Sequence, residues 1–99
     1  MIRSFADRAS EDVFNGFNSP AARKACPQAL WPVARRKLDL LDSAEQLADL
    51  RVPPGNRLEA LRGDRAGRHS IRINEQYRLC FRWFDDGPED VEIVDYHSG

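Results

Sequence analysis

The side chains best suited to chemistry are arginines that alternate with apolar residues between Leu50 and Phe81, together with a tyrosine and a histidine near the end of the chain. The alternation predicts strands with one buried face and one cationic face. Arginine presents a planar fork of donors that fits phosphate in bidentate fashion. A cationic face on a small sheet favours a polyanion as the target, and RNA is the obvious candidate.

The charge is distributed unevenly along the chain. The formal net charge is −1 over 99 residues, but the stretch from Arg51 to Arg82 holds eight arginines and three acids, a balance of +5. From Trp83 to Gly99 there are six acids and no lysine or arginine. A total near zero therefore does not exclude nucleic-acid binding, because the local field decides it. A GC-rich coding bias explains the excess of arginine over lysine equally well, but not the clustering.

The length favours one domain covering residues 1–99. Cys26 and Cys80 lie far apart and lack metal-ligand spacing, so we expect two reduced, mostly buried thiols. Charged residues near the N-terminus leave no signal-peptide core, and no apolar run is long enough to cross a membrane. We therefore expect a cytoplasmic protein without membrane contact.

Local patterns predict helices first and an antiparallel meander second, an α+β domain with N-terminal helices packed on one sheet face. Ser10 is the expected N-cap of a helix over residues 11–17. The main helix covers Pro27–Ala44, or begins at Pro32, where proline suits the first turn. The expected strands are a short one at Ile2–Phe5 and then Arg57–Leu61, Arg68–Asn74, Tyr77–Phe84 and Asp90–Tyr96.

Several segments, in order and at matching spacing, resemble HigB-type toxins of the RelE/ParE superfamily. The clearest are Arg51-Val52-Pro53-Pro54-Gly55-Asn56-Arg57-Leu58-Glu59, Leu61-Arg62-Gly63-Asp64-Arg65, Tyr77-Arg78-Leu79-Cys80-Phe81-Arg82-Trp83 and Val91-Glu92-Ile93-Val94-Asp95-Tyr96-His97. The resemblance covers essentially the whole chain. It implies the RelE-like fold and a toxin of a type II toxin–antitoxin system that cleaves mRNA in the ribosomal A site.

The resemblance also implies partners. A HigA-type helix-turn-helix antitoxin would neutralise the toxin, and the pair would bind its own operator DNA. Ribosome and mRNA would be the targets. No cofactor or metal is expected, because RNA can be cut without metal when its 2′-hydroxyl attacks the adjacent phosphate. That reaction needs a base, an acid and cations for the extra phosphate charge.

The family's catalytic residues map largely to the terminal Asp95, Tyr96 and His97. His97 is the best general acid or base, since its ordinary pKa lies near neutral pH. Tyr96 would stack on a base or orient the phosphate, and Asp95 would hold the histidine ring or act as a base. Arg78 matches a family arginine and is assigned to the scissile phosphate. A terminal Tyr-His pair can equally be a capping contact or a partner-binding patch.

Glu59 stands where some HigB members carry a catalytic histidine. It could replace that base, or it could pair with an arginine of a neighbouring strand. The remaining phosphate candidates are Arg65, Arg68, Arg72 and Arg82. Arg65 and Arg68 would grip flanking RNA, whereas Arg72 or Arg82 could simply pair with the acidic tail. Arg35, Arg36 and Lys37 could extend the basic surface.

Two other functions remain open at this point. A ParE-like toxin would bind DNA gyrase without cutting nucleic acid, and a decayed toxin would retain only RNA binding. The Asp95-Tyr96-His97 terminus argues against the first, and the absence of histidine at Glu59 keeps the second open. No phosphate-binding glycine loop, nucleophile elbow or metal-ligand cluster is apparent in the sequence.

Overall fold

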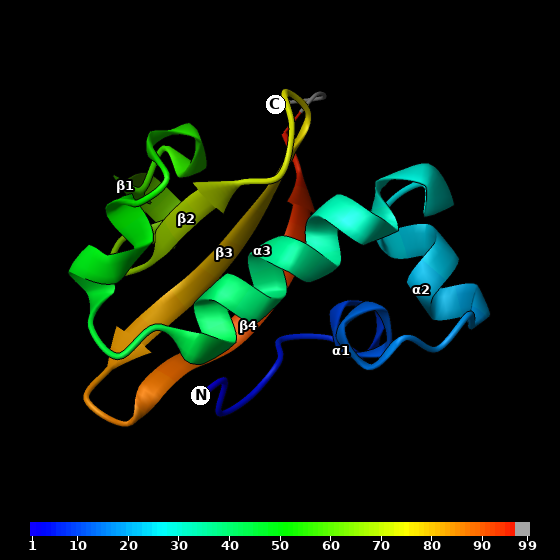
Figure 1. Cartoon of the computed structure of the whole chain (residues 1–99), viewed down its shortest axis with the longest axis horizontal. Helices are drawn as coiled ribbons and strands as arrows, with labels where there is room; N and C mark the ends of the chain where they lie inside the picture. Colours follow the sequence, from blue (N-terminus) through cyan, green and yellow to red (C-terminus); the bar gives the residue numbers. More distant parts are fainter. Residues whose placement is uncertain (97–99) are drawn as a thin grey trace.

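In the computed structural model, which describes residues 1–96, a helical half is followed by an antiparallel sheet (Figure 1). The helices are α1 (Arg8–Asn15), α2 (Pro20–Ala25) and α3 (Trp31–Ser43), and the strands are β1 (Glu59–Ala60), β2 (His69–Arg72), β3 (Tyr77–Phe84) and β4 (Gly87–Asp95). Four short 3₁₀ turns complete the described part: η1 (Gln28–Leu30), η2 (Leu47–Arg51), η3 (Pro54–Asn56) and η4 (Gly63–Arg65). The strand order is β1-β2-β3-β4, and every neighbouring pair is antiparallel. The predicted α+β class is thus confirmed.

The core lies between α3 and one face of the sheet (Figure 1). Ala34, Leu38 and Leu41 occur at helical spacing and are fully buried. Ile71, Leu79, Phe81 and Val91 supply the facing surface of the sheet and are also fully buried. The period of two in β2 and β3 therefore leaves the alternate residues, including Ser70 and Arg78, on the face away from α3.

The first residues of the helices differ in part from those that the local sequence patterns predict. α3 begins at Trp31 with Pro32 in its first turn, so the later of the two predicted starts is confirmed to within a residue. Ser10 as an N-cap is wrong, because the Asp7 carboxylate accepts the Ser10 backbone N–H at 2.7 Å and caps α1. Ser10 is fully buried instead, and its hydroxyl accepts the Ile93 N–H at 2.9 Å. The short helix α2, capped by Ser19, was not expected.

The observed strands match the predicted ones best where apolar and polar residues alternate over the longest stretch. β3 has the predicted bounds, while β1 is only two residues long. The Ile2–Phe5 strand reduces to an isolated parallel bridge between Phe5 and Val91. β4 begins earlier than predicted, at Gly87, whose φ of 128° and close approach to the Met1 carbonyl leave no space for a side chain.

Both cysteines are free and buried, as expected from the sequence. Within residues 1–96, no helix has the length and apolar character needed to cross a membrane.

Candidate RNA-binding and cleavage site

A pocket of about 420 Å³ opens where β2 and β3 meet the end of β4. We call it the Arg78 pocket; its lining residues are Arg57, Glu59, Arg72, Asn74, Glu75, Arg78 and Tyr96. It brings together three of the five predicted catalytic residues, namely Glu59, Arg78 and Tyr96. Figure 1 shows the end of β4 beside the turn that joins β2 to β3, which is how residues distant in sequence converge here.

Arg78 is the most firmly held cation of the pocket. Its Nε donates to the Ser70 hydroxyl at 2.8 Å, and one terminal nitrogen, Nη2, donates to the Arg57 carbonyl at 2.6 Å. The same nitrogen lies 3.9 Å from a Glu59 carboxylate oxygen. Only 12% of the side chain is exposed. The other terminal nitrogen has no hydrogen-bond partner among residues 1–96, so the guanidinium is fixed with one donor group available to a ligand.

The turn before β1 supplies the carbonyl that fixes Arg78. Arg57 adopts the left-handed backbone conformation, with φ 47°. The preceding residue, Asn56, is fully buried, and its amide donates to the carbonyls of Leu50 and Val52, both at 3.2 Å. The Lys37 ammonium of α3 donates to the Asn56 side-chain oxygen. A buried amide therefore connects α3 to the turn that positions Arg78.

Tyr96 closes the pocket on the β4 side. Its hydroxyl lies 3.6 Å from the Cys80 sulfur, and either group can be the donor. Burial of the hydroxyl end, together with this contact, raises the pKa of Tyr96 to about 12, although 38% of the residue is exposed. Burial likewise raises the pKa of the Cys80 thiol. Tyr96 is therefore protonated at neutral pH and can donate a hydrogen bond or a proton there, but cannot accept a proton as a base.

Three of the four predicted phosphate-binding arginines are paired with acids of β4. Arg65 and Arg68 both bind one oxygen of Glu92, at 2.7 and 3.1 Å. The hydrogen bond to Glu92 raises the pKa of Arg65. Arg82 lies 3.4 Å from a carboxylate oxygen of Asp90. Of the two arginines for which pairing with the acidic tail was an alternative, Arg82 forms such a pair.

Arg72 differs from these arginines, because its side chain forms no hydrogen bond or ion pair within residues 1–96. It lines the Arg78 pocket and also a second pocket beside α3. Its cross-strand partner is Arg78.

The remaining predicted residues are placed less directly. Asp95 ends β4 and does not line the Arg78 pocket; its carboxylate accepts both hydrogen bonds from the Gln76 amide nitrogen at 3.3 Å. The Glu59 side chain is 58% exposed, lines the pocket and lies 3.9 Å from Arg78, while its role as a base stays a prediction. His97 lies outside the described residues. No three His, Cys, Asp or Glu side chains within residues 1–96 are grouped to hold a metal ion.

Sequence reasoning missed three supporting residues. Ser70 holds Arg78, Asn56 fixes the turn, and Cys80 contacts Tyr96. The alternation of β2 and β3 already places Ser70 and Cys80 on the same face as Arg78, so the sequence pattern could have identified these two residues. Nothing local indicates that Asn56 is buried.

A family model for HigB, a RelE-like toxin of type II toxin–antitoxin systems, matches residues 3–97. The chain belongs to the HigB-like toxin family. It is 51% identical over 85 residues to the Vibrio cholerae protein Toxin HigB-1, covering 86% of each chain. It is 44% identical over 72 residues to an uncharacterised Haemophilus influenzae protein, covering 73% of this chain and 70% of that one.

The fold of this HigB-like toxin is also that of a solved structure. A chain of the YoeB–YefM complex from Staphylococcus aureus superposes with a TM-score of 0.60 at 14% identity, covering 98% of both chains. At this identity the likeness concerns the fold alone. The predicted family and the predicted RelE-like fold are both confirmed.

Proposed function

We propose that this HigB-like toxin is a ribosome-dependent mRNA endonuclease that acts in the cytoplasm and inhibits translation. It would cut mRNA in the ribosomal A site by attack of a 2′-hydroxyl on the adjacent phosphate, without a metal ion. The observation that carries this proposal is the fixed Arg78 guanidinium, which shares a pocket with a protonated tyrosine and an exposed carboxylate.

Arg78 would bind the scissile phosphate. As the 2′-oxygen attacks, negative charge grows on the non-bridging phosphate oxygens. A preorganised guanidinium stabilises that charge without having to reorient during the reaction. Ser70 and the Arg57 carbonyl provide the preorganisation, since they occupy two donor positions and leave the remaining terminal nitrogen for the phosphate. Arg72, which lies opposite Arg78 on the neighbouring strand β2, would bind a neighbouring phosphate oxygen.

Proton transfer would be divided between groups of different acidity. Glu59 carries an exposed carboxylate suited to accept the 2′-hydroxyl proton. Tyr96 stays protonated at neutral pH and would donate a hydrogen bond to the phosphate or a proton toward the 5′-oxygen leaving group. His97 follows Tyr96 directly in the chain and remains our predicted acid or base, with Asp95 as its orienting group.

The partners follow from the family. We expect a HigA-type helix-turn-helix antitoxin, and operator DNA bound only through the toxin–antitoxin complex. The solved neighbour is a complex of YoeB with YefM, which supports a partner protein for this fold. Arg65, Arg68 and Arg82 would bind RNA only after a phosphate replaces the carboxylate with which each of them is paired.

The test is controlled expression in bacterial cells of the wild-type chain and of His97→Ala and Arg78→Gln variants, with mapping of mRNA 5′ ends. We expect new in-frame ends within translated regions for the wild type and their loss in both variants. Growth arrest without such ends would overturn the proposal and favour gyrase or uncut ribosomes as the target. Cuts that persist in His97→Ala alone would retain the nuclease and discard the histidine.

A further inference from the structure

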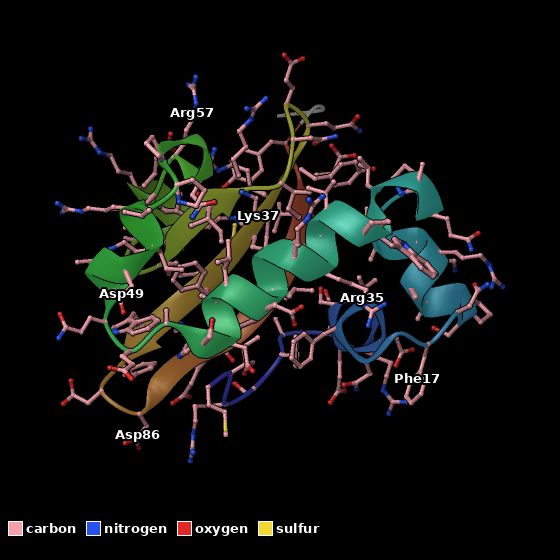
Figure 2. All side chains as sticks on the ribbon, in the orientation of Figure 1. Phe17, Arg35, Lys37, Asp49, Arg57 and Asp86 are labelled. Atoms are coloured by element: carbon pink, nitrogen blue, oxygen red, sulfur yellow. The ribbon has the colours of Figure 1, made fainter. Side chains whose placement is uncertain are left out.

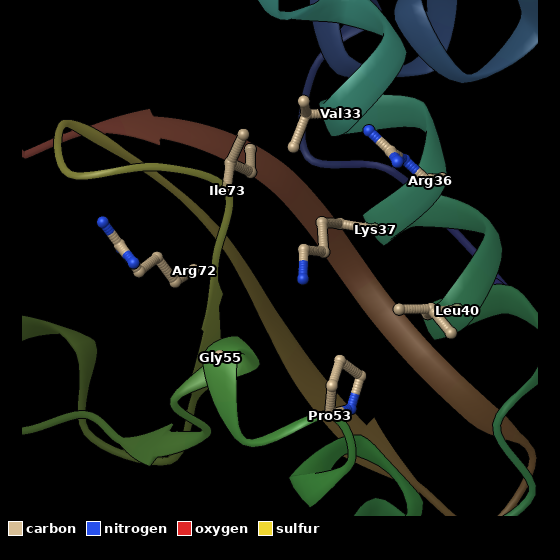
Figure 3. A pocket seen from close by; sticks show the side chains of 8 residues that line it. All are labelled: Val33, Arg36, Lys37, Leu40, Pro53, Gly55, Arg72 and Ile73. Carbon is tan, nitrogen blue, oxygen red and sulfur yellow. The ribbon is translucent and has the colours of Figure 1, made fainter.

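A second cationic pocket lies beside α3, and none of its described lining residues is acidic. We call it the Lys37 pocket; it has a volume of about 400 Å³ and is formed between α3, η3 and the end of β2 (Figure 3). Three cations line it: Arg36, Lys37 and Arg72. The rest of its lining is apolar or backbone: Val33, Leu40, Pro53, Gly55 and Ile73.

The cations of this pocket lack compensating charge. Arg36 and Arg72 make no ion pair within residues 1–96, and Lys37 has only the neutral Asn56 amide as its partner. Burial, followed by the nearby charges of Arg36 and Arg72, lowers the pKa of Lys37. Three uncompensated cations around one cavity repel one another, so an anion bound among them would relieve the repulsion.

The Lys37 pocket and the Arg78 pocket share Arg72. A ligand that fills both must therefore carry negative charge at repeated positions along its length, as a phosphodiester chain does. The apolar walls of the Lys37 pocket suit a ribose or a base between two phosphates, since ligand sites combine apolar walls with a few placed polar groups. The space beside Gly55 is open, since no atom beyond its chain neighbours lies within 4 Å of the position that a Cβ would occupy there.

We propose that the Lys37 pocket binds a flanking nucleotide of the same mRNA strand whose scissile phosphate lies at Arg78, with Arg72 bridging the two positions. This inference rests on the proposed function. It assigns Arg36 and Lys37 to the RNA phosphate backbone.

α3 offers a matched control for this assignment. Arg35 carries the same charge on the neighbouring residue, but it lines a different pocket and its guanidinium lies against Gly16. Figure 2 shows Lys37 on the side of α3 toward β2 and Arg35 on the side toward α1. Arg35→Gln and Arg36→Gln change the net charge equally, and only the second removes a lining cation of the Lys37 pocket.

The experiment measures binding of fluorescently labelled toxin to ribosomes programmed with a non-cleavable 2′-O-methyl mRNA. Single methylphosphonate linkages, which remove one phosphate charge, are placed in turn along the mRNA. We expect Arg36→Gln and Lys37→Gln to weaken binding about tenfold and Arg35→Gln less than about twofold. The penalty of Arg36→Gln should vanish at one flanking methylphosphonate position, which identifies the phosphate as its partner. Arg36 is exposed, so this variant does not depend on the Asn56 contact that Lys37→Gln disturbs.

The failures of the two proposals are distinguishable. A penalty that no methylphosphonate position changes would overturn the mRNA subsite and indicate ribosomal RNA. Weaker binding of the antitoxin, with ribosome binding unchanged, would overturn it in favour of an acidic peptide. Wild-type toxin that does not bind programmed ribosomes would overturn the proposed function and this subsite with it. Binding with no cleavage of ordinary mRNA would overturn only the nuclease.

Discussion

Arg72 and Arg78 face each other as direct cross-strand partners on β2 and β3. Like charges at such positions destabilise a sheet. Arg78 is compensated by Ser70, by the Arg57 carbonyl and by the nearby Glu59 carboxylate, whereas Arg72 forms no ion pair within residues 1–96. The arrangement is therefore unfavourable in the free protein and favourable once a phosphate lies between the two arginines.

Arg72→Gln should stabilise the free protein while weakening RNA binding. Removing the repulsion should raise the free energy of unfolding by about 0.5 kcal/mol at low salt. The gain should shrink at high salt, where charges are screened. Thermal unfolding at two ionic strengths measures this, with Arg51→Gln at an exposed position as the control. A loss of stability in Arg72→Gln at low salt would contradict the interpretation.

Arg78→Lys tests preorganisation separately from charge. Lysine keeps the positive charge but cannot donate to Ser70, to the Arg57 carbonyl and to a phosphate in one fixed plane. We expect transcript cleavage to fall about 100-fold, with the fold retained by circular dichroism. Arg23→Lys on the exposed face of α2 provides the control. Cleavage within a few-fold of wild type would show that a mobile charge suffices.

Much of the sheet and half of the site could be predicted from the sequence. Strict alternation over β3 fixes both its bounds and its buried face, because a shift by one residue would expose Leu79 and Phe81. The alternation separated Arg78 from the apolar residues of its strand, but it did not show which face of the sheet Tyr96 lies on. The family motifs then identified these two residues as candidates.

The partners of the arginines could not be predicted. Arg65 and Glu92 are 27 positions apart, and their pairing depends on how η4 folds over β3 and β4. The same holds for the caps: Ser10 and Asp7 are both good N-cap residues, but Asp7 caps α1, and the Ser10 hydroxyl accepts a hydrogen bond from Ile93 of a distant strand. Local patterns contain no information about such contacts.

Glu92→Gln should release two arginines from one carboxylate. Arg65 and Arg68 would then be available to RNA, so affinity for programmed ribosomes should rise and depend more steeply on salt concentration. The matched control is Glu11→Gln, which breaks only the exposed 3.9 Å pair with Arg8. Equal affinity and an equal salt slope in wild type and Glu92→Gln would show that Arg65 and Arg68 do not reach RNA.

Asn56→Ala should destabilise the whole site. It leaves the buried Leu50 carbonyl and the Val52 carbonyl without their donor, and Lys37 without its acceptor. We expect a loss of about 2–3 kcal/mol in the free energy of unfolding, measured by urea denaturation. Asn18→Ala, at an exposed loop position, should change it by less than about 0.5 kcal/mol. A similar small loss in Asn56→Ala would mean that water replaces the amide.

The pKa of Tyr96 predicts how the protein responds to alkaline pH. Folding raises this pKa from 10.0 to about 12, so the folded chain holds the phenol proton more tightly than the unfolded chain does. The resulting stabilisation is fully present below pH 10 and is lost as the pH rises from 10 toward 12.

The phenolate absorbance difference between wild type and Tyr96→Phe isolates this group, because Tyr77 is the other tyrosine and is common to both. A Cys80→Ala variant should lower the midpoint, since the hydrogen bond with Cys80 contributes to the raised pKa. A midpoint at or below 10 in the wild type would show that the hydroxyl is solvated and would contradict its burial against Cys80.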